Sequence, residues 1–519
     1  MDRLEFALTK DQFRKALSLL FDQRPDGDND PERGFLALIF PATGLKRRTL
    51  ILGDIVEPMP GEVSWSPQRG LTMSHRYYSR AMSLAQSTSG AGLINVHSHP
   101  RPATGILPPR PSPQDLRTDQ EELCFASRAV GEQRPIAAGV ITPGGGISVR
   151  EYTFRHPRSQ AEAVLAAFGA GGASFRYAEH IRVVGPGLRV LRGNPDKPSD
   201  NVPIDLSMTD SSALLWGEAG QRILAELTIG IAGLGGVGGM LAEHVARLGI
   251  GSLVIVDYDR LEDGNFNRSQ GATRAESKSG APKVGVYSRI AAEAATAPNF
   301  NVAKYCESVA ETEGLRPLLD CDVILAAADD AFARQVLDHA AYAHLILIVD
   351  GGTTLVANPR TLRLEAGKSQ IVSAGPGHAC LECQGVYTRE EATVARESAS
   401  WGRYLELGQV QDAADQRETR APSVICNNAL VAGLLGLRLL ALTLRLTPAT
   451  MRGIQRYYVE DGTLRWGAIR ECKDGCVKNS WLGKGDSHFV PVGIDLRWTE
   501  LREKEQEQQK GLLEGIQEQ

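Results

Sequence analysis

Two histidines lie one residue apart in INVHSHPRPATGILPPRPSPQDL, the stretch from residue 94 to residue 116. His97 and His99 follow a short apolar run that is typical of a buried β-strand. Side chains at positions i and i+2 of a strand point to the same side, so both imidazoles can reach one metal ion. Asp115 is the natural third ligand, because two histidines and a carboxylate leave a fourth tetrahedral position open for water. The residues therefore predict a catalytic zinc site, whereas an isolated H-x-H pair is more often polar surface.

The order of these residues also resembles a known signature. An HSHP motif followed at a distance by S-x-x-D is similar to that of the JAMM (JAB/MPN-type) metalloproteases, which include deubiquitinating and precursor-processing enzymes. The resemblance implies that His97, His99 and Asp115 hold zinc. It also implies that Glu32, in PERGFLALIF, is general base and acid on the attacking water, and that Ser112 donates a hydrogen bond to the oxyanion. The expected reaction is peptide or isopeptide hydrolysis; the alternative is a metal-free scaffold domain.

The spacer of this first motif departs from the family pattern. RPATGILPPR lengthens the usual connection by several residues and adds prolines. A proline-stiffened loop is extended and has little entropy to lose, so it can still return Asp115 to the metal. We expect the same loop to form a wall of a substrate groove.

A glycine-rich turn follows an apolar run in the second half of the chain. GIAGLGGVGG places Gly233, Gly235, Gly236 and Gly238 between a predicted strand and a predicted helix, where the backbone can turn tightly and approach a phosphate. Asp257, at the end of LVIVD, satisfies the rule for an acid that binds ribose. This pattern alone fits NAD, FAD, S-adenosylmethionine or ATP.

The next stretch favours ATP among these ligands, because it resembles a known family. VDYDRLEDGNFNRSQ and SGAPKV are similar to the D-x-D…N-x-x-R-Q and G-x-P-K elements of the ThiF/MoeB-like adenylyltransferase superfamily, which also contains the ubiquitin-activating enzymes. The resemblance implies a site for ATP and Mg2+, in which Asp257 binds ribose and Asp329 helps to hold magnesium. The remaining nucleotide-binding residues that it implies are Asp259, Asn265, Arg268 and Lys283, the last three at the triphosphate. Arginine, lysine and Mg2+ would neutralise the departing pyrophosphate.

The resemblance further implies a protein substrate, the C-terminal glycine of a ubiquitin-like or sulfur-carrier protein, and a homodimer formed through this domain. The family often has an arginine upstream of the G-x-x-G-Q element that reaches the phosphate across the dimer interface. Here Ser211 stands at about that place, although Arg222 is nearby. The source of such an arginine is therefore open.

Eight cysteines include two close pairs, CLEC and ECKDGC. Cys380, Cys383, Cys472 and Cys476 are expected to close a structural, four-sulfur zinc site, which the family commonly has here. No cysteine occurs from Gly385 to Val424, so either thioester transfer uses Cys426 or the acyl-adenylate passes directly to another protein's thiol or sulfur. Cys426 begins an apolar helix, and we expect it to be a packed core residue rather than a nucleophile.

The rest of the chain supplies the elements that position these groups. Short apolar runs from Phe35 to Val140, with two helical stretches among them, predict an α/β domain with a mainly antiparallel sheet. The later alternation of strands and helices predicts a Rossmann-like, doubly wound domain. We expect the metallopeptidase domain at 1–192, a linker at 193–207, the adenylyltransferase domain at 208–482 and a C-terminal segment at 483–519. The segment's charged end predicts a solvated helix or frayed tail, with a docking segment as the alternative.

The composition and charge of the chain argue against nucleic-acid and membrane partners. With 42% hydrophobic residues, 23% charged residues and a net charge of -5, the 519-residue chain offers no electrostatic case for nucleic acid. No run approaches about 18 uninterrupted apolar residues, and the N-terminus is charged, so we expect a cytoplasmic protein without a membrane partner.

Together these observations predict a bifunctional enzyme of a bacterial ubiquitin-like conjugation pathway. One half would activate the modifier for a separate conjugating enzyme, and the other would trim precursors or cut conjugates, as in antiviral operons. The alternative is activation and processing of a sulfur carrier.

Overall fold

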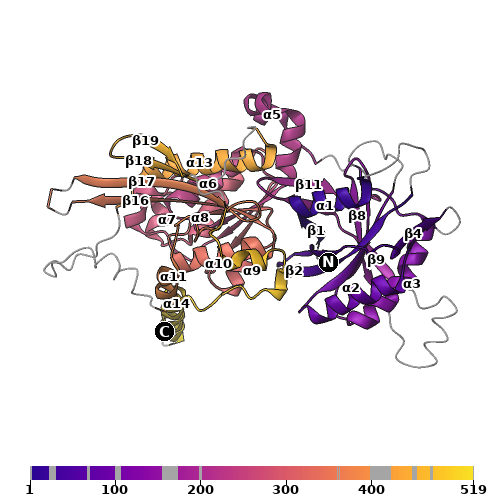
Figure 1. The fold of residues 1–519 in the computed structure, drawn as a ribbon. Helices are drawn as coiled ribbons and strands as arrows, with labels where there is room; N and C mark the ends of the chain where they lie inside the picture. The colour runs from indigo at the N-terminus through magenta and orange to yellow at the C-terminus, as the bar shows by residue number, and fades with distance from the viewer. Residues whose placement is uncertain are drawn as a thin grey trace. The chain divides into compact units, whose positions relative to one another are not determined.

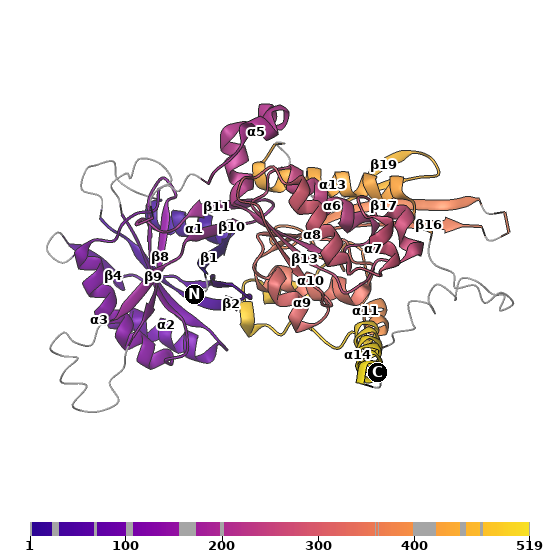
Figure 2. The same ribbon diagram turned by 180° about the vertical axis from the view of Figure 1, so that it is seen from behind.

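The computed structural model describes residues 3–22, 31–66, 70–99, 107–154, 173–197, 202–358, 360–361, 363–397, 422–446, 453–467 and 471–517. The chain divides into two compact units (Figures 1 and 2). Unit 1 comprises Met1–Asp200, Ala343–Leu345 and Ser480–Phe489, and unit 2 comprises Asn201–Tyr342, Ile346–Asn479 and Val490–Gln519. Most of the spacer expected to line a groove, 100–106, lies outside the described residues, as does 398–421 in the crossover after CLEC.

Unit 1 is built on a nine-stranded mixed sheet in the order β11-β10-β1-β3-β2-β6-β7-β8-β9. Neighbouring strands are antiparallel except for β10–β1, β1–β3 and β6–β7. The strands are β1 Arg3–Thr9, β2 Gly34–Thr43, β3 Arg47–Val56, β6 Gly92–Ser98, β7 Ile136–Ile141, β8 Ile147–Thr153, β9 Ser174–Tyr177, β10 His180–Val184 and β11 Leu188–Arg192. A separate hairpin pairs β4 Val63–Ser66 with β5 Gly70–Met73.

Helices cover both faces of this sheet because β2 is apolar on both. Alternate residues of β2 enter two different cores: Phe35 packs with helix α1 (Lys10–Phe21), and Leu36 packs with helices α2 (His75–Ser87) and α3 (Pro113–Val130). An apolar run without alternation therefore marks a strand that is covered on both sides.

Unit 2 contains an eight-stranded sheet in the order β14-β13-β12-β15-β16-β17-β18-β19. The first five strands run parallel and the last three are added antiparallel. The strands are β12 Thr228–Ala232, β13 Ser252–Val256, β14 Asn301–Tyr305, β15 Val323–Ala326, β16 Leu347–Ala357, β17 Leu364–Ala374, β18 Ile454–Tyr458 and β19 Thr463–Trp466. This is the doubly wound arrangement that the sequence predicts, extended by an antiparallel meander.

Strand order reverses between β12 and β15, since β13 and β14 lie on one side of β12 and β15 lies on the other. The crevice at the carboxyl ends of strands at such a switch point is where open α/β sheets bind ligands. The helices of unit 2 are α5 Leu206–Glu226, α6 Gly236–Arg247, α7 Arg274–Lys278, α8 Lys283–Ala294, α9 Thr312–Leu318, α10 Ala331–Ala343, α11 Arg389–Glu397, α13 Ile425–Leu444 and α14 Leu496–Gln517.

Helix α13 is long and apolar enough, by length and composition, to cross a membrane, and is the one such helix in the described part of the chain. It packs along α6, β16 and β17, with Leu435 and Leu439 buried. Arg438 is also buried there and donates to Ser373 Oγ at 2.9 Å. These contacts are those of the core helix of a globular unit.

Candidate functional sites

His97, His99 and Asp115 gather in unit 1, where β6 ends and α3 begins. Their potential ligand atoms all lie within 4.8 Å of one another. Asp115 Oδ2 is 3.1 Å from His99 Nε2 and 3.5 Å from His97 Nε2. His97 is 5% exposed, and its Nε2 makes no hydrogen bond within the described residues. A buried imidazole nitrogen that faces a carboxylate but lacks a hydrogen bond suits a metal ligand, so the donor set fits zinc.

The alternation of β6 and the cap of α3 explain how the three ligands meet. Ser98 points the other way, and its Oγ accepts from the Arg33 backbone N–H at 2.9 Å. Ser112 caps α3: its Oγ accepts from Asp115 N at 3.1 Å, and Asp115 Oδ2 accepts from Ser112 N at 2.6 Å. This reciprocal capping box fixes the carboxylate toward the histidines. Burial raises the pKa of Asp115, but the two histidine rings and the Ser112 N–H outweigh it and hold that pKa well below its usual range.

A cavity of about 200 Å3 lies against this cluster. Glu32, His97, Ser112 and Asp115 all line it, together with residues of the β4–β5 hairpin. The structure thus brings the expected general base, the oxyanion donor and two of the expected zinc ligands to one hollow, with His99 beside it. Their catalytic roles remain predictions.

Sequence reasoning missed three further polar residues that line the same cavity, Asn95, Asp119 and Glu122. Asp119 Oδ2 accepts from buried Arg150 at 2.7 Å. Burial raises the pKa of Glu122, which accepts from Tyr78 Oη at 2.5 Å. A usable signal existed for Asn95, because it precedes His97 by two residues on the same face of β6.

In unit 2, the sulfur atoms of Cys380, Cys383, Cys472 and Cys476 lie within 4.8 Å of one another. The Cys380 and Cys476 sulfurs are 3.9 Å apart, and backbone N–H groups point at sulfur, with Cys383 N 3.3 Å from Cys380 Sγ. Four convergent thiols fit the closed tetrahedral site of a structural zinc ion.

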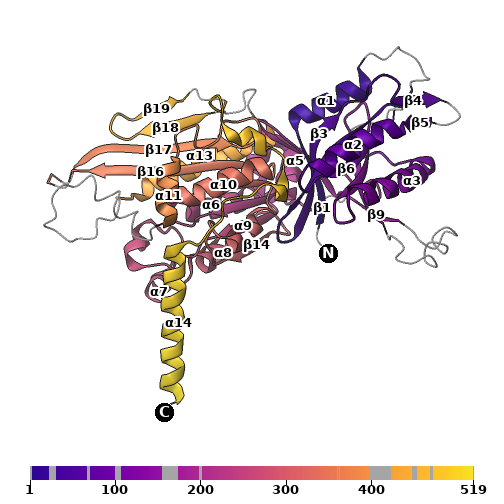
Figure 3. The ribbon, with the colours of Figure 1, turned by 60° about the horizontal axis from the view of Figure 1, so that its bottom comes forward.

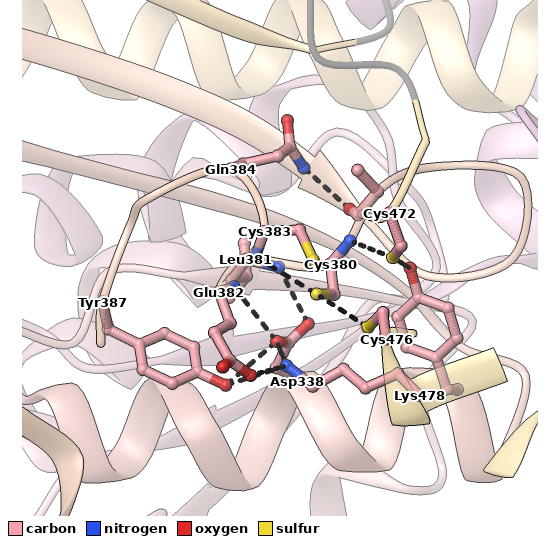
Figure 4. Close-up of polar contacts among 12 residues, drawn as sticks. Asp338, Cys380, Leu381, Glu382, Cys383, Gln384, Tyr387, Cys472, Cys476 and Lys478 are labelled. Carbon is pink, nitrogen blue, oxygen red and sulfur yellow. Dashed lines mark hydrogen bonds and ion pairs between the residues drawn. The ribbon is translucent and has the colours of Figure 1, made fainter. Parts of the chain in front are cut away.

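Asp338, from the middle of α10, joins the two cysteine pairs (Figure 4). It accepts from Leu381 N at 3.0 Å, inside the first pair, and forms an ion pair with Lys478, two residues after the second pair. Lys478 also donates to Tyr387 Oη at 3.0 Å and lies 3.3 Å from Glu382. Burial lowers the pKa of Lys478, but the charge of Asp338 outweighs it and raises the pKa above its usual range. No sequence pattern singled out this aspartate.

The glycine turn lies at the switch point of unit 2, between β12 and α6. Gly233 has a φ of +90°, and a Cβ at Gly238 would lie 1.9 Å from the Gly233 carbonyl oxygen. Gly235, the N-cap of α6, uses no side chain to cap the helix, and a Cβ there would meet nothing within 4 Å. The space beside Gly235 at the start of α6 is therefore open, which fits a phosphate group at the helix N-terminus.

The acidic residue expected at ribose follows β13. Asp257 accepts from Leu234 N at 2.5 Å and from Asp259 N at 2.7 Å, so it ties the glycine turn to the next loop. Burial raises the pKa of Asp257 to about 6, against the opposing charge of Lys283.

The cations expected at the triphosphate surround the same turn. Lys283 Nζ lies 2.7 Å from Asp259 Oδ2. Burial lowers the pKa of Lys283, but the charges of Asp257 and Asp259 outweigh it and raise that pKa above its usual value. Arg268 donates to Asn265 Oδ1 at 2.6 Å, and its Cδ would lie 3.5 Å from a Cβ at Gly236.

Asp329 lies just before α10, with its side chain exposed. Within the described residues no hydrogen bond or ion pair occupies its carboxylate, a hard oxygen ligand that suits Mg2+. Its charge contributes to the raised pKa of both Lys283 and Arg334. It therefore belongs to the same electrostatic site.

Asn428 is a further residue of this site that the sequence did not indicate. Its amide lies over the glycine turn, 2.2 Å from the place of a Cβ at Gly236.

Cys426, two residues earlier in the chain than Asn428, is exposed, so the expectation of a packed core cysteine is wrong. The reason is that the first turn of α13 stands outside the core, which the helix enters from Asn428 onward. Arg222 is engaged locally, with Glu218 at 2.5 Å.

Comparison with known proteins agrees with the geometry of unit 2. The model of the ThiF family matches residues 209–471, just over half of the 519 residues. A Zea mays protein named adenylyltransferase and sulfurtransferase MOCS3-1 is 31% identical over 185 residues, 34% of this chain and 38% of that protein. A Bombyx mori protein named ubiquitin-like modifier-activating enzyme 5 is 28% identical over 132 residues, 22% of this chain and 31% of that protein.

The matched part thus spans about a third of the length of these curated relatives. Among solved structures, that of E. coli MccB with MccA-N7isoASN has a TM-score of 0.42 at 15% identity and covers 53% of this chain and 77% of that one. The family match, the switch-point glycine turn and the acidic and basic residues around it agree, and this chain belongs to the ThiF family.

Proposed function

We propose that unit 2 uses ATP to adenylate the C-terminal carboxylate of a ubiquitin-like or sulfur-carrier protein. The observation that carries the proposal is the ring of Asp257, Lys283, Arg268 and Asn265 around an open glycine turn. A dehydrogenase has no need of a lysine and an arginine at this place. The names of the maize and silkworm relatives support a protein substrate of this kind.

The chain's own residues suit the charge changes of this reaction. Bound MgATP would supply the adenylyl group and a divalent charge at the phosphates. The N–H groups of α6 would hold a phosphate, and Asp257 would accept from ribose. Lys283 is kept protonated by two carboxylates, so it can exchange Asp259 for the departing pyrophosphate without changing its charge.

ATP–pyrophosphate exchange that depends on a diglycine-ended partner tests this proposal. Lys283→Ala and Asp329→Ala should each abolish exchange, whereas Lys278→Ala, an exposed lysine on α7, should leave it unchanged. Absence of exchange with every such partner would contradict the proposal.

We also propose that unit 1 is a zinc-dependent peptidase that acts on the same modifier, on precursors or on conjugates. Zinc held by His97, His99 and Asp115 would supply a Lewis acid that lowers the pKa of water. Glu32 lines the cavity and would take and return the proton. The Ser112 oxygen accepts from the helix N–H, and its hydroxyl hydrogen would be donated to an oxyanion.

Zinc content and cleavage separate this proposal from a scaffold role. The wild-type chain should hold two zinc ions, one in each cluster, and His97→Ala should hold one. Glu32→Gln should retain both ions but lose cleavage of a modifier fusion. Zinc content that His97→Ala does not change, together with no cleavage, would favour a scaffold domain.

Sulfur-carrier activation is the second candidate, favoured by the word sulfurtransferase in the name of the maize relative. In that case the adenylate would be converted to a thiocarboxylate rather than passed to a thiol for conjugation. Mass spectrometry of the modifier after ATP treatment distinguishes the two. A covalent adduct lost in Cys426→Ala would assign a thioester to that exposed cysteine.

In the conjugation pathway, a separate conjugating enzyme would receive the activated modifier. We further propose a homodimer through unit 2, supported by the exposed leucines of α5, Leu214 at 86% and Leu215 at 69%. Sedimentation analysis of the wild type and of Leu214→Gln tests it. Phage challenge of cells that carry wild-type or Lys283→Ala protein tests an antiviral role.

A further inference from the structure

Residues 490–502, which lead into α14 and form its first turns, pack against other parts of unit 2 close to the nucleotide site. Gly493 N donates to Ala310 O at 3.0 Å. Asp495 N donates to Glu311 Oε1 at 3.0 Å, and its carboxylate accepts from Ser308 Oγ at 2.6 Å. Several separate contacts therefore hold the chain just before α14. Figure 3 shows α14 as the long yellow helix.

The first turn of α14 is fixed against the loop that follows β13. Asp495 Oδ1 accepts from Arg497 N at 3.1 Å and from Trp498 N at 3.4 Å. Trp498 is 5% exposed and stacks on Tyr258, with ring centroids 5.4 Å apart. Tyr258 directly follows Asp257, the residue expected to bind ribose. The first turn of α14 thus contacts the residue that follows Asp257 in the chain.

Arg497 extends from this turn to the start of α10. Its guanidinium forms an ion pair with Asp330, whose side chain is 12% exposed. The other carboxylate oxygen of Asp330 accepts from Phe332 N at 2.5 Å and from Ala333 N at 3.2 Å. Both oxygens of Asp330 are therefore engaged, Oδ1 with the start of α10 and Oδ2 with α14.

We propose that Arg497 is a positioning residue for magnesium: it clamps Asp330 and thereby fixes the direction in which the adjacent Asp329 presents its carboxylate. The inference rests on the proposed adenylation site, in which Asp329 faces Mg2+. Asp329 is exposed, and within the described residues no ion pair holds it, so its orientation depends on the backbone on either side. Groups that orient a metal ligand without touching the metal typically change metal affinity by about 10–100-fold when removed.

Calorimetric titration of the full chain with ATP over a range of Mg2+ concentrations tests this. Arg497→Ala should raise the Mg2+ concentration for half-maximal tightening of ATP binding at least about tenfold. ATP binding in excess chelator should not change, because Arg497 is expected to act only through the metal. Asp330→Asn, which keeps a side-chain oxygen to cap α10 but loses the ion pair, should show the same defect.

Arg502→Ala is the matched control. It removes another arginine of α14, which pairs with Glu311 at 3.3 Å and not with Asp330. A Mg2+ requirement in Arg497→Ala equal to that in Arg502→Ala would overturn the inference. Wild-type protein that binds no MgATP would instead reject the proposed function itself. If Arg497→Ala unfolds at the assay temperature, Asp330→Asn decides by the same comparison.

Discussion

Asp338 shows how much can depend on one buried side chain outside any recognisable motif. Its carboxylate is fully buried, and so is the Lys478 ammonium, with 1% of the side chain exposed. Two backbone N–H groups of the CLEC turn also donate to it. The same carboxylate thus orients one cysteine pair through the backbone and the other through Lys478, and we expect it to hold the four sulfurs together before metal binds.

We expect Asp338→Asn to lower the free energy of unfolding of unit 2 by about 3–5 kcal/mol, because it removes the fully buried carboxylate that pairs with a buried ammonium. Urea denaturation of the zinc-loaded chain measures this, and the rate of zinc transfer to a chromogenic chelator should rise in parallel. Glu382→Gln is the control: Glu382 contacts the same ammonium at 3.3 Å but is 24% exposed, and its loss should cost under about 1 kcal/mol. Equal losses in the two variants would refute the special role of Asp338.

At the scale of elements, the β12–α6 turn and the first turn of α3 use the same device. In both places the N-terminus of a helix lies at the proposed ligand site, near the carboxyl end of a strand: β12 for α6 and β6 for α3. In α6 the cap is a glycine that leaves the backbone bare, whereas in α3 it is Ser112, whose side chain fixes Asp115. The first arrangement suits an anion and the second suits a cation.

Two glycine substitutions in the β12–α6 turn should distinguish its effect on the stability of unit 2 from its effect on ATP binding. Gly238→Ala should destabilise unit 2 by about 1–3 kcal/mol, because its Cβ would lie 1.9 Å from a carbonyl oxygen. Gly235→Ala should leave the thermal midpoint nearly unchanged, since nothing lies within 4 Å, but should weaken ATP binding by filling the space for phosphate. Thermal melts measure the change in stability, and ATP titrations measure the change in affinity. Normal ATP affinity in Gly235→Ala would mean that phosphate does not approach this turn.

At the scale of the whole molecule, each unit has its own sheet and its own core. The histidine cluster belongs wholly to unit 1, and the nucleotide site and the cysteine cluster belong wholly to unit 2. The described residues of each site therefore come from a single unit.

Loss of one site should accordingly leave the binding at the other unchanged. His97→Ala should bind MgATP with an affinity within about twofold of wild type, and Lys283→Ala should keep its zinc in unit 1. Effects at separated sites without shared partners usually add. Metal analysis and calorimetry of the single and double variants check this, and a large non-additive change would reveal coupling between the units.

The sequence by itself determined the parts of this protein that depend on near neighbours in the chain. Alternation along a strand puts His97 and His99 on one side, and glycines between a strand and a helix make the anion-binding turn. Family resemblance then indicated which distant residues should join them, and the structure brings Asp115 to the histidines and Lys283 to the loop of Asp257.

Only the tertiary structure decided contacts made across long stretches of chain. Asp338 meets Lys478 across 140 residues, and Arg497 meets Asp330 across 167. No local pattern encodes such pairs, because which elements pack together is set by burial of apolar surface over the whole unit, and the polar partners are fixed only once that packing exists.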